Sequence, residues 1–204
     1  MMRPFVRFAR MMDRITEWVG NLAVYLVIIT FIVGFLNVVL RYSGRFVGMR
    51  LTSNLFIELQ WYLYSLIFFL GFAYILKNNI NVRVDFWYAE FEEKTKAWID
   101  LVGHLISLIP FCILALIVTY PPVMTSWGRK PDGTFPTWRL WEIWEKSPDP
   151  SGLPRAPIKT VILLAFILLL LQGIAELIKL VAVLRDYEDD EVQLATLDAP
   201  IRIE

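Results

Sequence analysis

The sequence predicts an all-α, polytopic membrane protein with four transmembrane helices and additional amphipathic helices at the membrane interface. The chain is 57% hydrophobic and has a mean hydropathy of +0.53. A helix rises about 1.5 Å per residue, so about 20 residues cross a hydrocarbon core. Backbone groups cannot bond to water there, so an isolated span must be helical. Four long runs carry almost no charge: residues 19–40, 59–76, 101–127 and 161–175.

The four spans are expected to form a single membrane domain over residues 1–185, because they leave no room for a second globular domain of ordinary size. The expected spans are residues 19–40, 55–77, 101–120 and 158–184. Residues 186–204 are rich in acidic side chains and are expected to form a flexible tail.

Composition excludes several classes of function. Twenty basic and twenty acidic residues cancel, which gives no basic surplus for nucleic acid. Cys112 is the only cysteine, so no disulfide can form within the chain. His104 is the only histidine, which excludes a haem held by two histidines of this chain. No nucleophile–base pair or phosphate loop is present, so we expect no enzyme activity, no cofactor and no metal site.

Residues 3–18 have the pattern of a helix that lies in the membrane interface. At 100° per residue, the four arginines of this segment fall within about 60° of one another. Phe5 and Phe8 lie on the other side of the helix. An arginine face opposite an aromatic face is typical of an interfacial helix. The alternative is a basic flank that only orients the first span.

Residues 84–100 repeat this pattern in the connection between the second and third spans. Trp87, Phe91 and Trp98 share one side, and acidic residues occupy the other. A second interfacial helix is expected here, although the same apolar side could pack on a partner protein. Both segments are therefore candidates for membrane anchoring.

The longest connection covers residues 128–157, and its fold is not predicted by any motif. It is rich in proline and is flanked or occupied by half of the tryptophans: Trp127, Trp138, Trp141 and Trp144. Tryptophan favours headgroup depth at membrane edges, so we expect an ordered loop close to the membrane.

Orientation follows only weakly from charge. Four spans return both termini to one side, and basic residues are divided almost evenly between the two sides. The four arginines before the first span favour cytoplasmic termini.

Several polar side chains stand near the ends of the spans. Burial of a charge costs several kcal/mol, so such residues are paired, functional or close enough to the interface to reach headgroups. Interface anchoring and a bond across helices or subunits are both open for them. They are Asn37, Arg41, Glu58, Arg83, Asp85, Glu176 and Lys179. Within the third span, Pro110 is expected to bend the helix.

The second span and its flanks resemble the small membrane (Q-type) subunit of tripartite ATP-independent periplasmic (TRAP) transporters. That family has glutamate and tryptophan opening the second span, a glycine within it and a closing HVRVD-like motif. Similar residues here are Glu58, Trp61, Gly71 and the segment Asn81-Val82-Arg83-Val84-Asp85. Asn37 and Arg41 resemble the family's Asn…Arg pair in the first span. Residues 147–155 and 171–174 are similar to a longer subgroup associated with dicarboxylates, keto acids, mannitol-like and chloroaromatic compounds.

The resemblance implies a non-enzymatic scaffold in the bacterial inner (cytoplasmic) membrane. A periplasmic substrate-binding protein would deliver an organic acid, and a large elevator-type membrane subunit would carry it with sodium. The small subunit would bind the large subunit and membrane lipids. We therefore assign assembly roles to six residues: Asn37, Arg41, Glu58, Trp61, Arg83 and Asp85. Membrane anchoring is assigned to five others: Phe5, Phe8, Trp87, Phe91 and Trp98.

Two other readings remain open at this stage. The chain could be the membrane-anchor subunit of a respiratory or other enzyme complex, although one histidine is too few for the usual haem ligation. It could also be a free-standing small channel, which would need polar residues along the middle of its spans.

Overall fold

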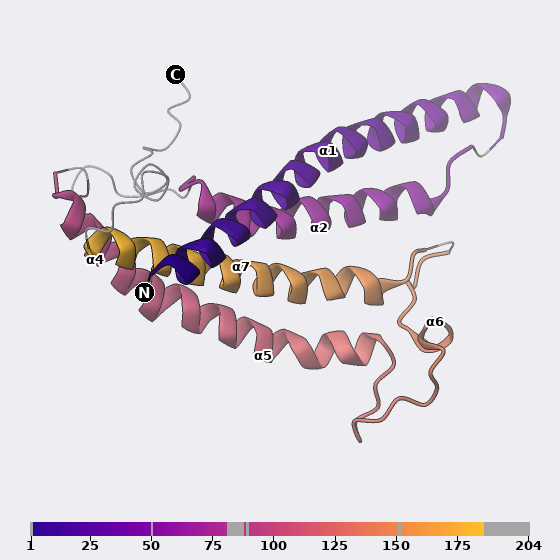
Figure 1. Ribbon diagram of the computed structural model, residues 1–204. Coiled ribbons are helices and arrows are strands. Elements are labelled where there is room, and N and C mark those ends of the chain that lie inside the picture. Colours follow the sequence, from indigo (N-terminus) through magenta and orange to yellow (C-terminus); the bar gives the residue numbers. More distant parts are fainter. Residues whose placement is uncertain (1, 50, 81–87, 89, 151, 186–204) are drawn as a thin grey trace. The chain divides into compact units, whose positions relative to one another are not determined.

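The computed structural model describes residues 2–49, 51–80, 88, 90–150 and 152–185. Its principal helices are α1 (Arg3–Val47), α2 (Asn54–Lys77), α4 (Glu93–Gly103), α5 (Ile109–Ser126), α6 (Leu140–Ile143) and α7 (Arg155–Leu184). Figure 1 shows their order along the chain. Four helical segments are long and apolar enough to cross a membrane, and the described residues contain no strand. The predicted fold class is confirmed.

Helix α1 does not contain the boundary expected near residue 18. Residues 3–18 continue directly into the first span as part of one 45-residue helix. Residues 5–19 contain neither proline nor glycine, so the sequence does not interrupt the backbone hydrogen bonding there. A helix of this length exceeds the roughly 20 residues that cross hydrocarbon.

The third span is likewise longer than expected. α4 is followed without a break by a π-helical turn (His104–Leu108) and by α5, so one segment covers Glu93–Ser126. Residues 81–87 and 89, which include the start of the expected interfacial helix, lie outside the described residues.

The π-helical turn is explained by Pro110. Proline has no N–H and its ring clashes with the carbonyl four residues earlier, which disfavours a regular α-turn. The N–H of Ile109 instead donates to the carbonyl of His104, five residues back. The backbone is therefore irregular just before Pro110, where it forms a wide turn.

The chain divides into two compact units. The first unit comprises Met1–Gly20, Phe72–Leu116 and Phe166–Glu204, and the second comprises Asn21–Gly71 and Ile117–Ala165. In the first unit, α1 contacts α7 through Ala9, Met12 and Ala175. A second apolar cluster joins α2, α5 and α7. Its buried members are Leu76, Cys112 and Leu169.

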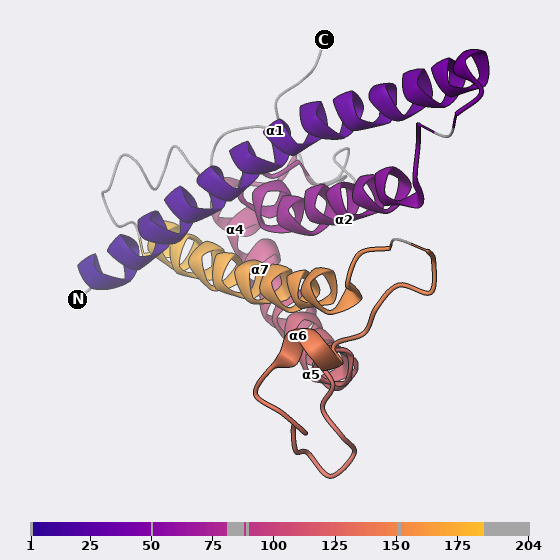
Figure 2. The same ribbon diagram turned by 90° about the vertical axis from the view of Figure 1, so that its right-hand side faces the viewer.

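The second unit contains the connection between α5 and α7, which includes the short helix α6 (Figure 2). Trp127 Nε1 donates to Thr160 Oγ1 over 2.7 Å, and its ring packs against Trp144. The N–H of Glu145 donates to the carbonyl of Ser126 over 2.7 Å. These contacts tie the middle of the connection back to the two helices that it joins.

Candidate functional site

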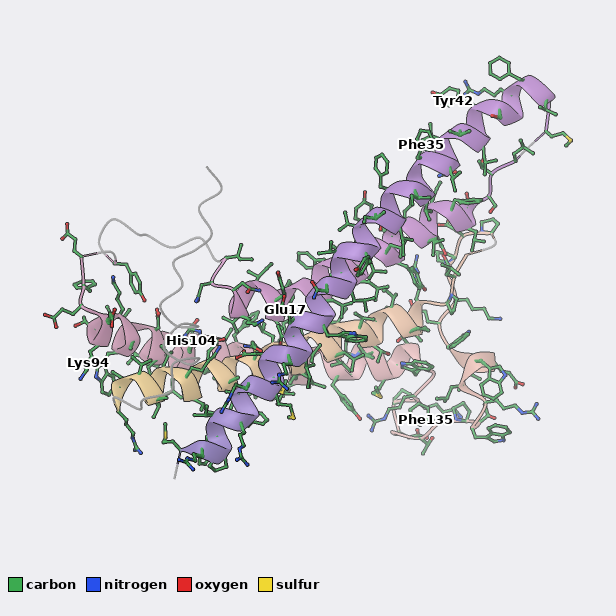
Figure 3. All side chains as sticks on the ribbon, turned by 45° about the horizontal axis from the view of Figure 1, so that its top comes forward. Glu17, Phe35, Tyr42, Lys94, His104 and Phe135 are labelled. Atoms are coloured by element: carbon green, nitrogen blue, oxygen red, sulfur yellow. The ribbon has the colours of Figure 1, made fainter. Side chains whose placement is uncertain are left out.

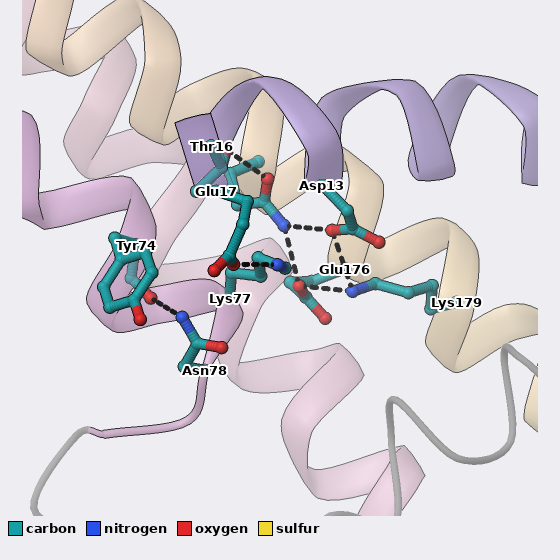
Figure 4. Close-up of polar contacts among 9 residues, drawn as sticks. Asp13, Thr16, Glu17, Tyr74, Lys77, Asn78, Glu176 and Lys179 are labelled. Atoms are coloured by element: carbon teal, nitrogen blue, oxygen red, sulfur yellow. Dashed lines mark hydrogen bonds and ion pairs between the residues drawn. The ribbon is translucent and has the colours of Figure 1, made fainter. Parts of the chain in front are cut away.

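The first unit holds a cluster of buried polar side chains between α1 and α7 (Figure 4). α7 contributes Gln172, Glu176 and Lys179, whose exposed fractions are 0%, 8% and 3%. α1 contributes Thr16, which is 1% exposed, and Asp13. We call these five residues the α1–α7 polar cluster.

Gln172 lies at the centre of this cluster. Its Oε1 accepts a hydrogen bond from Thr16 Oγ1 over 2.7 Å. Its Nε2 donates to Asp13 Oδ1 over 2.8 Å and to Glu176 Oε1 over 2.9 Å. One amide group therefore holds a hydroxyl and two carboxylates together, using both its acceptor and its donors.

Lys179 supplies the positive charge of the cluster. Its ammonium lies 2.7 Å from Glu176 Oε1 and 3.2 Å from Asp13 Oδ1. A buried charge is tolerated when it is paired and hydrogen-bonded, and removal of one partner leaves the other uncompensated. The cluster therefore joins α1 to α7, because its polar groups form hydrogen bonds and ion pairs with each other.

Helical spacing explains how these residues converge. Gln172, Glu176 and Lys179 are separated by four and then three residues, so they share one face of α7. Asp13 and Thr16 are three apart on α1. Glu176 and Lys179 stand out in the sequence as polar residues near the end of a span, whereas Asp13 and Thr16 do not. The spacing of polar residues on one face was the available signal.

A further ion pair in the first unit joins α1 to α2. Lys77 at the end of α2 binds Glu17 of α1. Nearby, Asn78 Nδ2 donates to the carbonyl of Tyr74 over 3.0 Å and extends the hydrogen bonding at the helix end (Figure 4). Both acidic side chains of residues 3–18 are thus engaged by lysines of other helices.

In the second unit, Glu58 binds the chain segment that precedes α7. Its carboxylate accepts hydrogen bonds from the hydroxyl of Ser147 and from the backbone N–H of Leu153. One turn further along α2, the hydroxyl of Tyr62 donates to the carbonyl of Pro154. We call this arrangement the Glu58 clasp.

Glu58 and Arg41, both assigned to assembly, do not pair with each other. Glu58 uses its carboxylate in the clasp, and Arg41 is exposed with no hydrogen bond or ion pair to any residue that the structure describes. Asn37 is half-buried on the same helix, and Trp61 is 73% exposed. Arg83 and Asp85 lie outside the described residues.

The residues assigned to membrane anchoring differ in their surroundings. Phe5, Phe91 and Trp98 are exposed. Phe8 instead packs against the apolar cluster between α1 and α7. Trp87 lies outside the described residues. Large apolar side chains are also exposed on α1 within the second unit, including Phe35 and Tyr42 (Figure 3).

The α1–α7 polar cluster and the Glu58 clasp contain too few acidic, histidine or cysteine side chains to form a metal-binding group. Among residues 2–49, 51–80, 88, 90–150 and 152–185, no group of three histidine, cysteine, aspartate or glutamate side chains could hold a metal ion. The polar groups of both arrangements bind each other and so connect the helices and segments that carry them.

Four apolar helices with internally paired polar groups define a helical, multi-pass membrane protein. Residues 30–183 match the family model described as "Tripartite ATP-independent periplasmic transporters, DctQ component". The chain belongs to this family and is a small membrane subunit of a TRAP transporter. Comparisons with curated proteins and with solved structures gave no match.

Proposed function

We propose that this chain is the membrane-fixed scaffold of a sodium-coupled TRAP transporter that takes up an organic acid. In this proposal a periplasmic binding protein delivers the acid and a large elevator-type subunit moves it. The family match favours a transporter subunit over the anchor of an enzyme complex. Both termini are proposed to lie in the cytoplasm, on the basis of the four arginines that precede the first apolar run.

The observation that carries the scaffold proposal is the α1–α7 polar cluster. A transport path needs polar groups that exchange partners with a passing ion or solute. Here Gln172, Glu176 and Lys179 are buried and bonded to each other and to α1. Such a cluster favours a fixed relation between two helices, as a static brace requires.

Reconstitution tests this proposal. The chain alone, the large subunit alone and the two together are placed in liposomes with a sodium gradient, a panel of organic acids and the binding protein. Sodium-dependent uptake is expected only when both membrane subunits are present. Saturable uptake by this chain alone would contradict the scaffold role.

Orientation is tested separately with reporter fusions at the C-terminus. A fluorescent reporter active only in the cytoplasm should give signal, and a phosphatase active only in the periplasm should not. The opposite pattern would reverse the proposed topology.

A further inference from the structure

The first turns of α1 present three different stripes along the helix. The buried stripe contains Val6, Ala9, Met12 and Thr16, each 3% exposed or less. Their spacing of three and four residues places them on one side of the helix, where Ala9 and Met12 pack with Ala175 of α7 and Val6 with Ala182. This side is occupied by the protein itself.

The second stripe is basic and exposed. Arg3, Arg7 and Arg14 fall within about 40° of one another at 100° per residue, and all three are exposed. None of them makes a hydrogen bond or an ion pair with another residue that the structure describes. We call these three residues the arginine stripe.

The third stripe is apolar and lies next to the arginine stripe. Met11, Ile15 and Trp18 are 51%, 39% and 69% exposed. They fall within about 60° of one another, and Met11 and Trp18 each follow an arginine by four residues. An exposed apolar strip beside a row of guanidinium groups matches a membrane interface, where headgroups lie next to acyl chains.

The acidic side chains of this segment do not neutralise the arginine stripe. Asp13 binds Lys179, and Glu17 binds Lys77. The positive charge of the stripe is therefore available to an external anion. Because residue 19 begins an uncharged run, the stripe also stands immediately before a membrane span.

We propose that the arginine stripe binds the headgroups of anionic phospholipids, while Met11, Ile15 and Trp18 contact the adjoining acyl chains. A guanidinium group matches phosphate with two parallel hydrogen bonds. An acidic soluble protein would satisfy the charge but would leave the adjoining apolar strip without a partner. This lipid site is independent of the transport role proposed above.

The test measures lipid selectivity of the full-length chain in bilayers. Spin-labelled phosphatidylglycerol and phosphatidylcholine are compared for the fraction immobilised at the protein surface. The wild type should prefer phosphatidylglycerol, and the preference should fall at high salt because screening weakens headgroup attraction. The triple variant R3Q/R7Q/R14Q should lose most of it, since one basic residue near an anionic surface corresponds to about a five-fold change in partitioning.

Two further variants separate this site from general charge effects. R45Q/K130Q/R139Q removes the same charge from exposed positions of the second unit and should keep the preference. R3K/R7K/R14K preserves the charge and should also keep most of it. The proposal is overturned if R3Q/R7Q/R14Q retains the wild-type preference, or if the control loses as much. It is also overturned if an acidic protein, and not anionic lipid, binds in a stripe-dependent way.

Discussion

Lys179 carries the only positive charge in the α1–α7 polar cluster. It faces the carboxylates of Asp13 and Glu176 while only 3% exposed. Its ammonium lies within hydrogen-bonding distance of both acids, so its contribution to stability depends on two other residues. A substitution of this one side chain therefore tests the bond between α1 and α7.

Lys179→Ala should lower the free energy of unfolding by about 3–5 kcal/mol, because two buried carboxylates lose their cation. The measurement is a denaturant titration in mixed detergent micelles. Lys130→Ala is the control: its side chain is exposed, and its loss should change stability by less than about 0.5 kcal/mol. Equal effects of the two substitutions would show that the cluster does not stabilise the fold.

Asp132 lies outside the membrane helices, in the turn at residues 130–134. Hydrogen bonds from the hydroxyl and the backbone N–H of Thr134, at 2.7 and 2.9 Å, lower the pKa of Asp132 below its ordinary value of 3.8. Because the folded pKa is the lower one, the stabilisation is present above the unfolded pKa. It is lost as pH falls through the folded pKa.

The turn at residues 130–134 should therefore stay closed at neutral pH and loosen only below about pH 4. Titration of the Asp132 carboxyl by nuclear magnetic resonance checks this. Thr134→Val should raise its pKa toward the ordinary value. Thr137→Val, in the same loop, should leave it unchanged. A pKa of Asp132 that does not respond to Thr134→Val would refute the assignment.

At the scale of elements, the Glu58 clasp connects α2 to the segment that leads into α7. Glu58→Ala removes the acceptor of the Ser147 hydroxyl and the Leu153 N–H. Hydrogen exchange in residues 145–155 should become faster while the helix α2 remains protected. Glu142→Ala, which removes an exposed pair with Arg139, should leave this exchange unchanged. Unaltered exchange in the Glu58 variant would mean that other contacts hold the segment.

Glycine at position 20 permits the close approach of α1 and α2 in the first unit. A β-carbon added there would overlap the ring of Tyr74, whereas one at Gly71 would meet nothing within 4 Å. Among the described residues, the close approach is therefore at Gly20 and not at Gly71.

Gly20→Ala should destabilise the protein by about 1–3 kcal/mol through overpacking against Tyr74. Gly71→Ala, the matched control, should be neutral or slightly stabilising, since alanine favours a helix over glycine. Thermal unfolding in detergent compares the two. The packing explanation fails if both variants unfold at the wild-type temperature.

At the scale of the whole molecule, Arg41 is the strongest remaining candidate for subunit assembly. It is exposed, and no described residue binds it. Its guanidinium fork suits a carboxylate of the large subunit. Arg41→Ala should reduce several-fold the amount of intact complex recovered in detergent, because the partner's charge would be stranded.

The Arg41→Ala complex that survives should bind substrate with near-normal affinity. Arg45→Ala is the control, because Arg45 is exposed on the same helix and stacks over Tyr42. Normal recovery combined with altered sodium dependence would place Arg41 in transport and argue against a scaffold.

From the sequence alone, the number of spans and the ends of the second and fourth helices could be predicted. The expected spans 55–77 and 158–184 agree with α2 and α7 within a few residues. Uncharged runs of this length are helical in hydrocarbon whatever surrounds them. The ends of the first and third spans were not determined in this way. The segments that flank them are amphipathic, and an amphipathic segment can either continue the transmembrane helix or form a separate helix at the interface.

Which helix faces meet depends on the tertiary fold. Periodicity placed Gln172, Glu176 and Lys179 on one face of α7, but it did not identify Asp13 and Thr16, more than 150 residues earlier, as their partners. The same applies to Glu58 and Ser147. A membrane helix is apolar on nearly every side, so no hydrophobic stripe marks the side that packs. The partner of each polar group is set by the helix that lies opposite it.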